Sequence, residues 1–125
     1  MNLASSIDSL YSVAYAFLEA DRIRDATNAF RVMVRFAPLD ERAWLGLGEC
    51  HERVGELEIA SELYGAGATV TSPPSARCLV ALARLARRSG ELDAAEEHYE
   101  SALSLAEATG DDALTELLRT EGVAA

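Results

Sequence analysis

The stretch WLGLGECHERVGELEIASELYGAGA, residues Trp44 to Ala68, decides the fold of this chain. It places the small residue Gly48 four positions after a tryptophan, and Gly55 seven positions after that. Ala60 and Tyr64 follow at a spacing of four, about one turn of a helix. Such a pattern identifies a repeat fold if it recurs along the chain at a constant period.

The pattern recurs on both sides of this stretch. The alanine-aromatic pair occurs three times, at intervals of 34 and 35 residues: Ala26 with Phe30, Ala60 with Tyr64, and Ala95 with Tyr99. Twelve positions before each alanine lies another small residue: Ala14, Gly48 and Ala83. Antiparallel helices approach closely only where side chains are short, so we expect these small residues to meet the alanines. A period near 34 residues is that of the tetratricopeptide repeat, a helix-turn-helix unit.

The sequence therefore predicts a single all-α domain, a tetratricopeptide-repeat solenoid. The domain consists of three helix-turn-helix repeats, at residues 7–40, 41–74 and 76–109, followed by a C-terminal capping helix at residues 111–121. Proline, helix-capping and turn residues stand near the expected helix ends: Asp21, Pro38, Asp40, Gly55, Pro73, Pro74, Ser75 and Gly90. Composition agrees, because half of the residues are hydrophobic and alanine, leucine and glutamate are frequent.

Charge and hydropathy exclude several classes of partner. The formal net charge is −10, which disfavours binding to nucleic acid or to an anionic membrane, because their phosphates would be repelled. No apolar run approaches the ~18 residues that would span a bilayer. The first six residues carry no positive charge and no long apolar stretch, unlike a secretory signal. We therefore expect a cytoplasmic protein in which the two cysteines, Cys50 and Cys78, are reduced.

Catalysis has no support in the sequence. The only two histidines, His51 and His98, fall on different predicted helices, and their acidic and cysteine neighbours lack the spacing of metal ligands. The chain contains neither a glycine-rich phosphate loop nor a nucleophile motif. We expect a protein that is not an enzyme and that needs no metal or cofactor.

The candidate binding surface is the concave side of the solenoid, which the first helix of each repeat lines. The predicted peptide-binding groove takes three residues from each repeat: Tyr11, Tyr15 and Leu18, then Leu45, Glu49 and Glu52, then Val80, Arg84 and Arg87. The side chains of this groove are aromatic in the first repeat, mixed in the second and basic in the third. Such a groove matches a peptide with an apolar part and an acidic part. Two alternatives stay open: the N-terminal residues or a second copy cover the aromatic end, or the arginines form a solvated face.

Three segments resemble the class II chaperones of bacterial type III secretion systems. They are LYSVAYAFLEADRIRDATNAF at residues 10–30, WLGLGECHERVGELEIA at 44–60 and YGAGA at 64–68. The resemblance runs from about Leu10 to Val70, and the Leu-Gly-Leu-Gly run at 45–48 is its most specific part. The resemblance weakens in the third repeat, where the Gly90-Glu91-Leu92 turn still matches.

This resemblance implies a function. Class II chaperones are small acidic tetratricopeptide proteins that hold hydrophobic translocator subunits in the bacterial cytosol before export. A short extended translocator segment lies in their groove, which implies that Tyr11, Tyr15 and Leu18 line pockets for its apolar residues. The resemblance also implies a homodimer through an N-terminal helical segment, of which this chain has nine residues before Leu10. The alternative function is a generic tetratricopeptide scaffold in another assembly, binding through its convex face or its third repeat.

Overall fold

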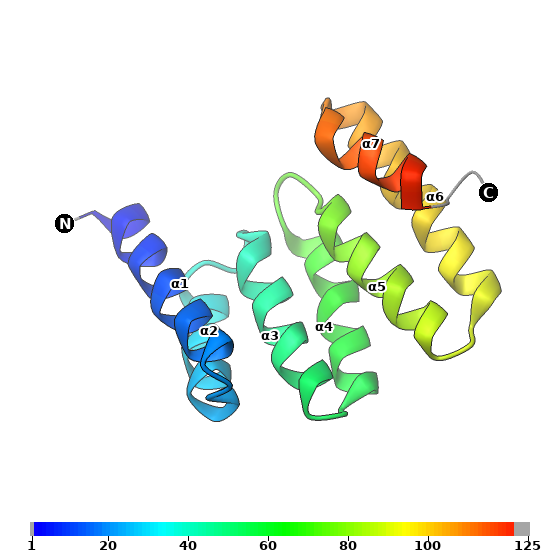
Figure 1. Cartoon of the computed structure of the whole chain (residues 1–125). Helices are drawn as coiled ribbons and strands as arrows, with labels where there is room; N and C mark the ends of the chain where they lie inside the picture. Colours follow the sequence, from blue (N-terminus) through cyan, green and yellow to red (C-terminus); the bar gives the residue numbers. More distant parts are fainter. Residues whose placement is uncertain (1, 122–125) are drawn as a thin grey trace.

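The computed structural model describes residues 2–121, which form seven α-helices and, over that range, no strand. Three antiparallel helical hairpins follow one another along the chain, and a last helix packs on the third hairpin (Figure 1). The helices are α1 (Leu3–Glu19), α2 (Ile23–Phe36), α3 (Glu41–Arg53), α4 (Leu57–Val70), α5 (Ala76–Arg88), α6 (Leu92–Thr109) and α7 (Asp112–Glu121). The prediction of an all-α repeat solenoid is confirmed.

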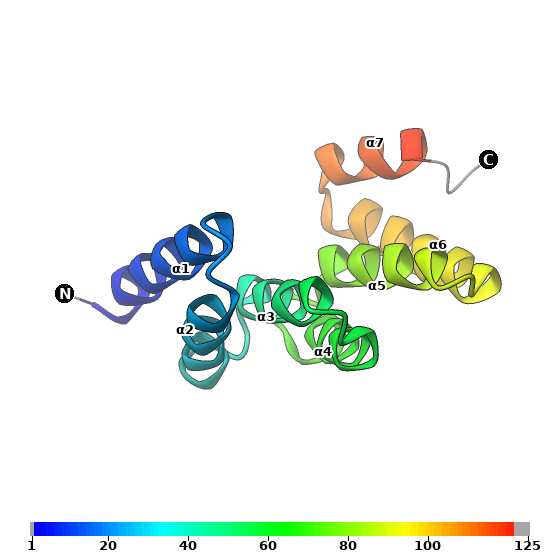
Figure 2. The same ribbon diagram turned by 60° about the horizontal axis from the view of Figure 1, so that its bottom comes forward.

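The first helices of the hairpins form one wall of the solenoid. Helix α3 contacts both α1 and α5, whereas among residues 2–121 α4 contacts neither α2 nor α6. The second helices therefore splay apart while the first helices stay together, and the stack curves around α1, α3 and α5. Figure 2 shows α1 and α3 lying over α2 and α4 on one side of the stack. No helix in the described range is long and apolar enough to cross a membrane.

Capping and turn residues set the helix ends where the sequence predicted them. The side chain of Asp40 accepts the backbone N–H of Arg42 at the start of α3, and the Ser75 hydroxyl accepts that of Cys78 at the start of α5. These side chains satisfy backbone donors that have no partner inside the helix. Gly55 and Gly90 adopt φ values of +82° and +81° in the turns within hairpins, a conformation that favours glycine.

Small residues lie at the contacts between helices. The alanines and small residues of the repeat pattern are buried, as expected from their spacing: Ala14, Ala26, Gly48, Ala60, Ala83 and Ala95. The aromatic partners Phe30, Tyr64 and Tyr99 are buried as well. Helix α7 covers the third hairpin, where Leu114 and Leu118 join Val80 and Tyr99 in one apolar cluster. This arrangement leaves the inner wall of α1, α3 and α5 uncovered in its middle.

Candidate peptide-binding groove

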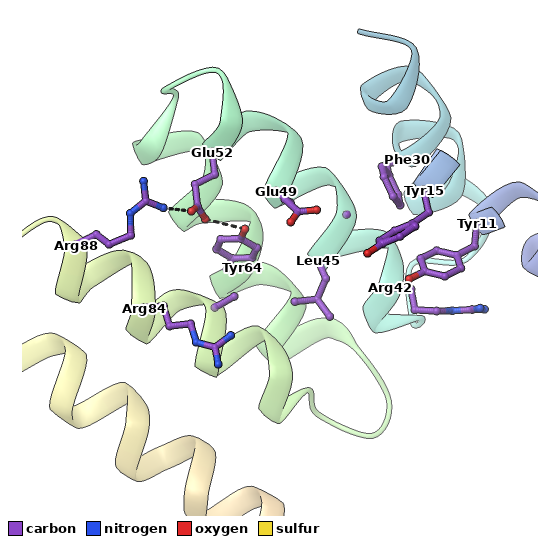
Figure 3. A pocket seen from close by; sticks show the side chains of 12 residues that line it. Tyr11, Tyr15, Phe30, Arg42, Leu45, Glu49, Glu52, Tyr64, Arg84 and Arg88 are labelled. Atoms are coloured by element: carbon purple, nitrogen blue, oxygen red, sulfur yellow. Dashed lines mark hydrogen bonds and ion pairs between the residues drawn. The ribbon is translucent and has the colours of Figure 1, made fainter. Parts of the chain in front are cut away.

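A hollow of about 380 Å³ opens on this inner wall (Figure 3). We call it the concave hollow. Helices α1, α3 and α5 supply its sides, and single aromatic residues of α2 and α4 reach its floor. Its lining residues are Tyr11, Tyr15, Phe30, Arg42, Leu45, Gly46, Glu49, Glu52, Tyr64, Ala81, Arg84 and Arg88.

The structure brings most of the predicted groove residues together. Those that line the concave hollow are Tyr11, Tyr15, Leu45, Glu49, Glu52 and Arg84. Arg87 lies outside it, and its guanidinium is stacked over the ring of Tyr99, 4.6 Å from the ring centroid. Tyr15 remains 45% exposed, so the aromatic end of the hollow is accessible within residues 2–121.

Two predicted groove residues belong to the core instead. Leu18 is only 1% exposed, because the end of α1 is covered by α3, whose Arg53 donates to the Leu18 carbonyl over 3.0 Å. Val80 is 4% exposed, because α6 and α7 close over that face of α5. The expectation that these two side chains line a groove was wrong: both stabilise the fold, and neither is available to a ligand.

The floor of the concave hollow consists of residues that the groove prediction missed. Phe30 and Tyr64 come from the second helices, whereas the prediction took groove residues from the first helices only. Their rings reach the hollow beside glycines of α3. A Cβ on Gly46 would lie 2.1 Å from Phe30 Cε1, and one on Gly48 would lie 2.3 Å from Tyr64 Cε1. The repeat pattern contained a signal for these residues, because Phe30 and Tyr64 are the aromatic members of its alanine-aromatic pairs on the second helices.

The aromatic end of the hollow consists of neighbouring aromatic rings and an arginine paired with carboxylates. The ring centroids of Tyr11 and Tyr15 are 5.9 Å apart, and that of Phe30 lies 6.3 Å from Tyr11 in an edge-on arrangement. The Arg42 guanidinium lies 4.7 Å from the Tyr11 centroid. Burial raises the pKa of the Tyr11 phenol, so this phenol is neutral at physiological pH.

Arg42 is itself fixed from two directions. It donates to Asp40 Oδ2 over 2.7 Å and to Asp8 Oδ1 over 2.9 Å. These bonds join α1 to α3 across the edge of the hollow. The guanidinium also holds the pKa of the Asp40 carboxyl below its usual value, mainly through their hydrogen bond.

The basic end of the hollow is neutralised within the molecule. Glu52 accepts the Tyr64 hydroxyl over 2.9 Å and pairs with Arg88 (Figure 3). Arg84 donates through Nε to Glu121 Oε2 over 3.1 Å, at the end of α7. The expected match to an acidic peptide depended on free arginines. The structure removes that basis, because Arg84 and Arg88 already hold carboxylates.

Within residues 2–121 no three histidine, cysteine or acidic side chains gather into a group that could hold a metal ion. His51 pairs with Glu56 at 3.2 Å, and both cysteines are buried as free thiols. The concave hollow can therefore bind apolar side chains against rings and polar groups at its edges, which is the chemistry of a peptide site.

Known proteins share both the sequence pattern and the fold. The tetratricopeptide repeat family profile matches residues 78–121. The Low calcium response locus protein H of Yersinia pestis is 29% identical over 100 residues, which are 75% of this chain and 60% of that protein. The match therefore spans about 60% of the length of this curated relative.

Solved structures extend the similarity along the whole chain. PcrH from Pseudomonas aeruginosa superposes with a TM-score of 0.81 at 28% identity, covering 100% of this chain and 96% of PcrH. SycD, the type III secretion translocator chaperone of Yersinia enterocolitica, superposes with a TM-score of 0.82 at 24% identity, covering 94% and 88%. This chain has the translocator-chaperone fold. PcrH in complex with the chaperone binding region of PopB also matches, with a TM-score of 0.79 at 27% identity over 96% of each chain. The resemblance that the sequence indicated is confirmed.

Proposed function

We propose that this chain is a cytoplasmic chaperone of a bacterial type III secretion system. It holds an extended apolar segment of a hydrophobic translocator protein in the concave hollow, and so keeps the translocator soluble and unassembled before export. The observation that carries this proposal is the open aromatic end of the hollow at Tyr11 and Tyr15. The complex of PcrH with the chaperone binding region of PopB, on the same fold, supports it.

The energetics of the hollow fit a reversible complex. Burying one leucine-sized side chain contributes about 1.5–3 kcal/mol. A segment with two or three such anchors gains several kcal/mol before it loses its conformational freedom, and micromolar affinity corresponds to about 8 kcal/mol. A chaperone that must release its client for export needs binding in this range rather than an irreversible contact. The proposed contact residues are therefore the accessible ones, Tyr11, Tyr15 and Leu45, with the buried rings of Phe30 and Tyr64 forming the floor beneath them.

The test is co-expression with a hydrophobic translocator protein of the same secretion system, followed by titration calorimetry of the purified proteins. We expect Tyr11→Ala with Tyr15→Ala to weaken binding by at least about tenfold, since interface aromatics contribute ~1–2 kcal/mol or more each. Phe36→Ala is the matched control, because Phe36 is an exposed aromatic outside the hollow. Unchanged affinity of the double variant would exclude the concave hollow as the client site.

One observation favours the alternative of a general scaffold. A second hollow, also of about 380 Å³, lies between α4, α5 and α6, away from the aromatic end. Leucines lie in it and glutamates surround them: Leu57, Leu82 and Leu85 with Glu58, Glu62 and Glu91. If Leu57→Asp abolished client binding while the double tyrosine variant retained it, the scaffold interpretation would replace the groove.

A further inference from the structure

Almost every charged side chain of the concave hollow has its charge balanced inside the molecule. Arg42 holds Asp40 and Asp8, and its face lies against the Tyr11 ring. The opposite end repeats this arrangement in two pairs: Glu52 with Arg88, and Arg84 with Glu121. A client that covers these groups would meet formed ion pairs and would not need to supply partners for them.

Glu49 has the loosest ion pair of these residues. Within residues 2–121 its carboxylate accepts no hydrogen bond, and the nearest cationic atom is Arg53 Nη2 at 3.8 Å. This ion pair is a loose one with no hydrogen bond, and Arg53 Nη1 instead donates to the Leu18 carbonyl over 3.0 Å. The Glu49 side chain is 45% exposed, so water solvates it in the free protein. Figure 3 shows the carboxylate among Leu45, Tyr15 and Tyr64, which line the same hollow.

A client that fills the aromatic end must also cover this carboxylate. Removing water from a carboxylate without replacing its hydrogen bonds is strongly unfavourable, whereas a cation brought against it makes a charge-assisted bond in a poorly hydrated place. The pair would form where Leu45 and Tyr15 exclude water, so it would be stronger than an exposed surface pair.

We propose that the client segment carries a lysine or arginine next to its apolar anchors, and that Glu49 selects for it. This inference rests on the proposed function and adds the charge of the client to it. It reverses the expectation from the sequence, which paired an acidic client with the arginines of α5. Arg84 and Arg88 are paired with Glu121 and Glu52, and the carboxylate of the hollow that is held least tightly is that of Glu49.

The probe is a set of short synthetic peptides that tile a hydrophobic translocator protein of the same secretion system. Each peptide is made with its own basic residues and again with glutamine in their place. Fluorescence anisotropy should show that the wild-type chaperone prefers the basic version of the bound peptide by about tenfold. Glu49→Gln should abolish the preference, and Glu49→Arg should invert it toward a peptide with glutamate at that position.

The matched control is Glu96→Gln, which removes the same charge from an exposed position of α6 outside the hollow and should leave the preference intact. Thermal unfolding of each variant checks that it folds. If the wild type binds a peptide and Glu49→Gln keeps the same preference, the role of Glu49 is excluded while the proposed function stands. If no peptide binds, or if the double tyrosine variant binds equally well, both the role of Glu49 and the proposed function are excluded.

Discussion

Gly46 of α3 leaves the space that the ring of Phe30 occupies: a Cβ there would lie 2.1 Å from Cε1 of that ring. Gly48 stands in the same relation to Tyr64, at 2.3 Å. Both glycines belong to the Leu-Gly-Leu-Gly run, and both rings reach the concave hollow from the second helices. The glycines therefore serve the site as well as the packing, because they let the aromatic floor approach the groove.

Gly46→Ala should destabilise the protein despite the better helix propensity of alanine. The propensity gain is up to ~1 kcal/mol, but the new Cβ overlaps a buried ring, and overpacking a core costs about 1–3 kcal/mol. We expect a lower free energy of unfolding in urea. The displaced Phe30 ring should also weaken client binding per folded molecule.

Gly65→Ala is the matched control for that substitution. Gly65 also lies inside a helix, α4, but a Cβ there would meet no atom within 4 Å. Only the propensity difference remains, so we expect stabilisation by about 0.5–1 kcal/mol. Equal effects of the two alanines on urea unfolding would contradict the close approach of Gly46 to Phe30.

The repeat pattern was sufficient to predict the fold because its signals are local. The spacing of Ala26 and Phe30 lies within one helical turn, and the Asp40 cap acts over two residues. The burial of Leu18 was not predictable in the same way. It depends on where the end of α3 crosses α1, which is set by the tilt of one hairpin against the next rather than by the spacing within α1.

Leu18→Ala and Tyr15→Ala should separate the core from the groove. Leu18 is fully buried, so truncation should lower the free energy of unfolding by about 2–5 kcal/mol. Tyr15 is half exposed, and its removal should change stability by less than ~1 kcal/mol while weakening client binding. Urea unfolding and calorimetry measure the two effects. A Leu18→Ala protein that is stable but does not bind its client would restore Leu18 to the groove.

The pairing of charges in the site could not be predicted from the sequence either. The arginines of α5 are visible in the chain, but their partners are not their neighbours. Arg84 pairs with Glu121, 37 residues away, and Arg88 with Glu52, 36 residues away. Only the packing of α7 and α3 against α5 brings these groups together. Glu49, by contrast, has only the loose ion pair with Arg53, four residues further along α3 at 3.8 Å.

The two buried thiols should react slowly with alkylating reagents. Burial raises the pKa of Cys78 to about 11 and also raises that of Cys50. Since only the thiolate reacts, the Cys78 rate at pH 8 should be at least about a hundredfold below that of an unfolded cysteine, and it should rise with pH. Mass spectrometry after iodoacetamide treatment, with and without urea, measures the ratio. Rapid labelling of the native protein would show that these thiols are accessible.

Acid should loosen α7 first at its C-terminal end. Arg84 and the Tyr99 hydroxyl hydrogen-bond to Glu121, and the Arg84 bond chiefly lowers the pKa of that carboxyl. A carboxyl whose pKa is lower in the folded state stabilises fully above its ordinary pKa of about 4.3, and loses that contribution as the pH falls through the folded value. Melting temperature should therefore fall between about pH 5 and pH 3, with Glu121 contributing about 1 kcal/mol or less.

Glu121→Gln should flatten this profile, whereas Glu116→Gln should not, because Glu116 is exposed and makes no ion pair within residues 2–121. Identical pH profiles for the two glutamine variants would mean that the Arg84 pair does not anchor α7.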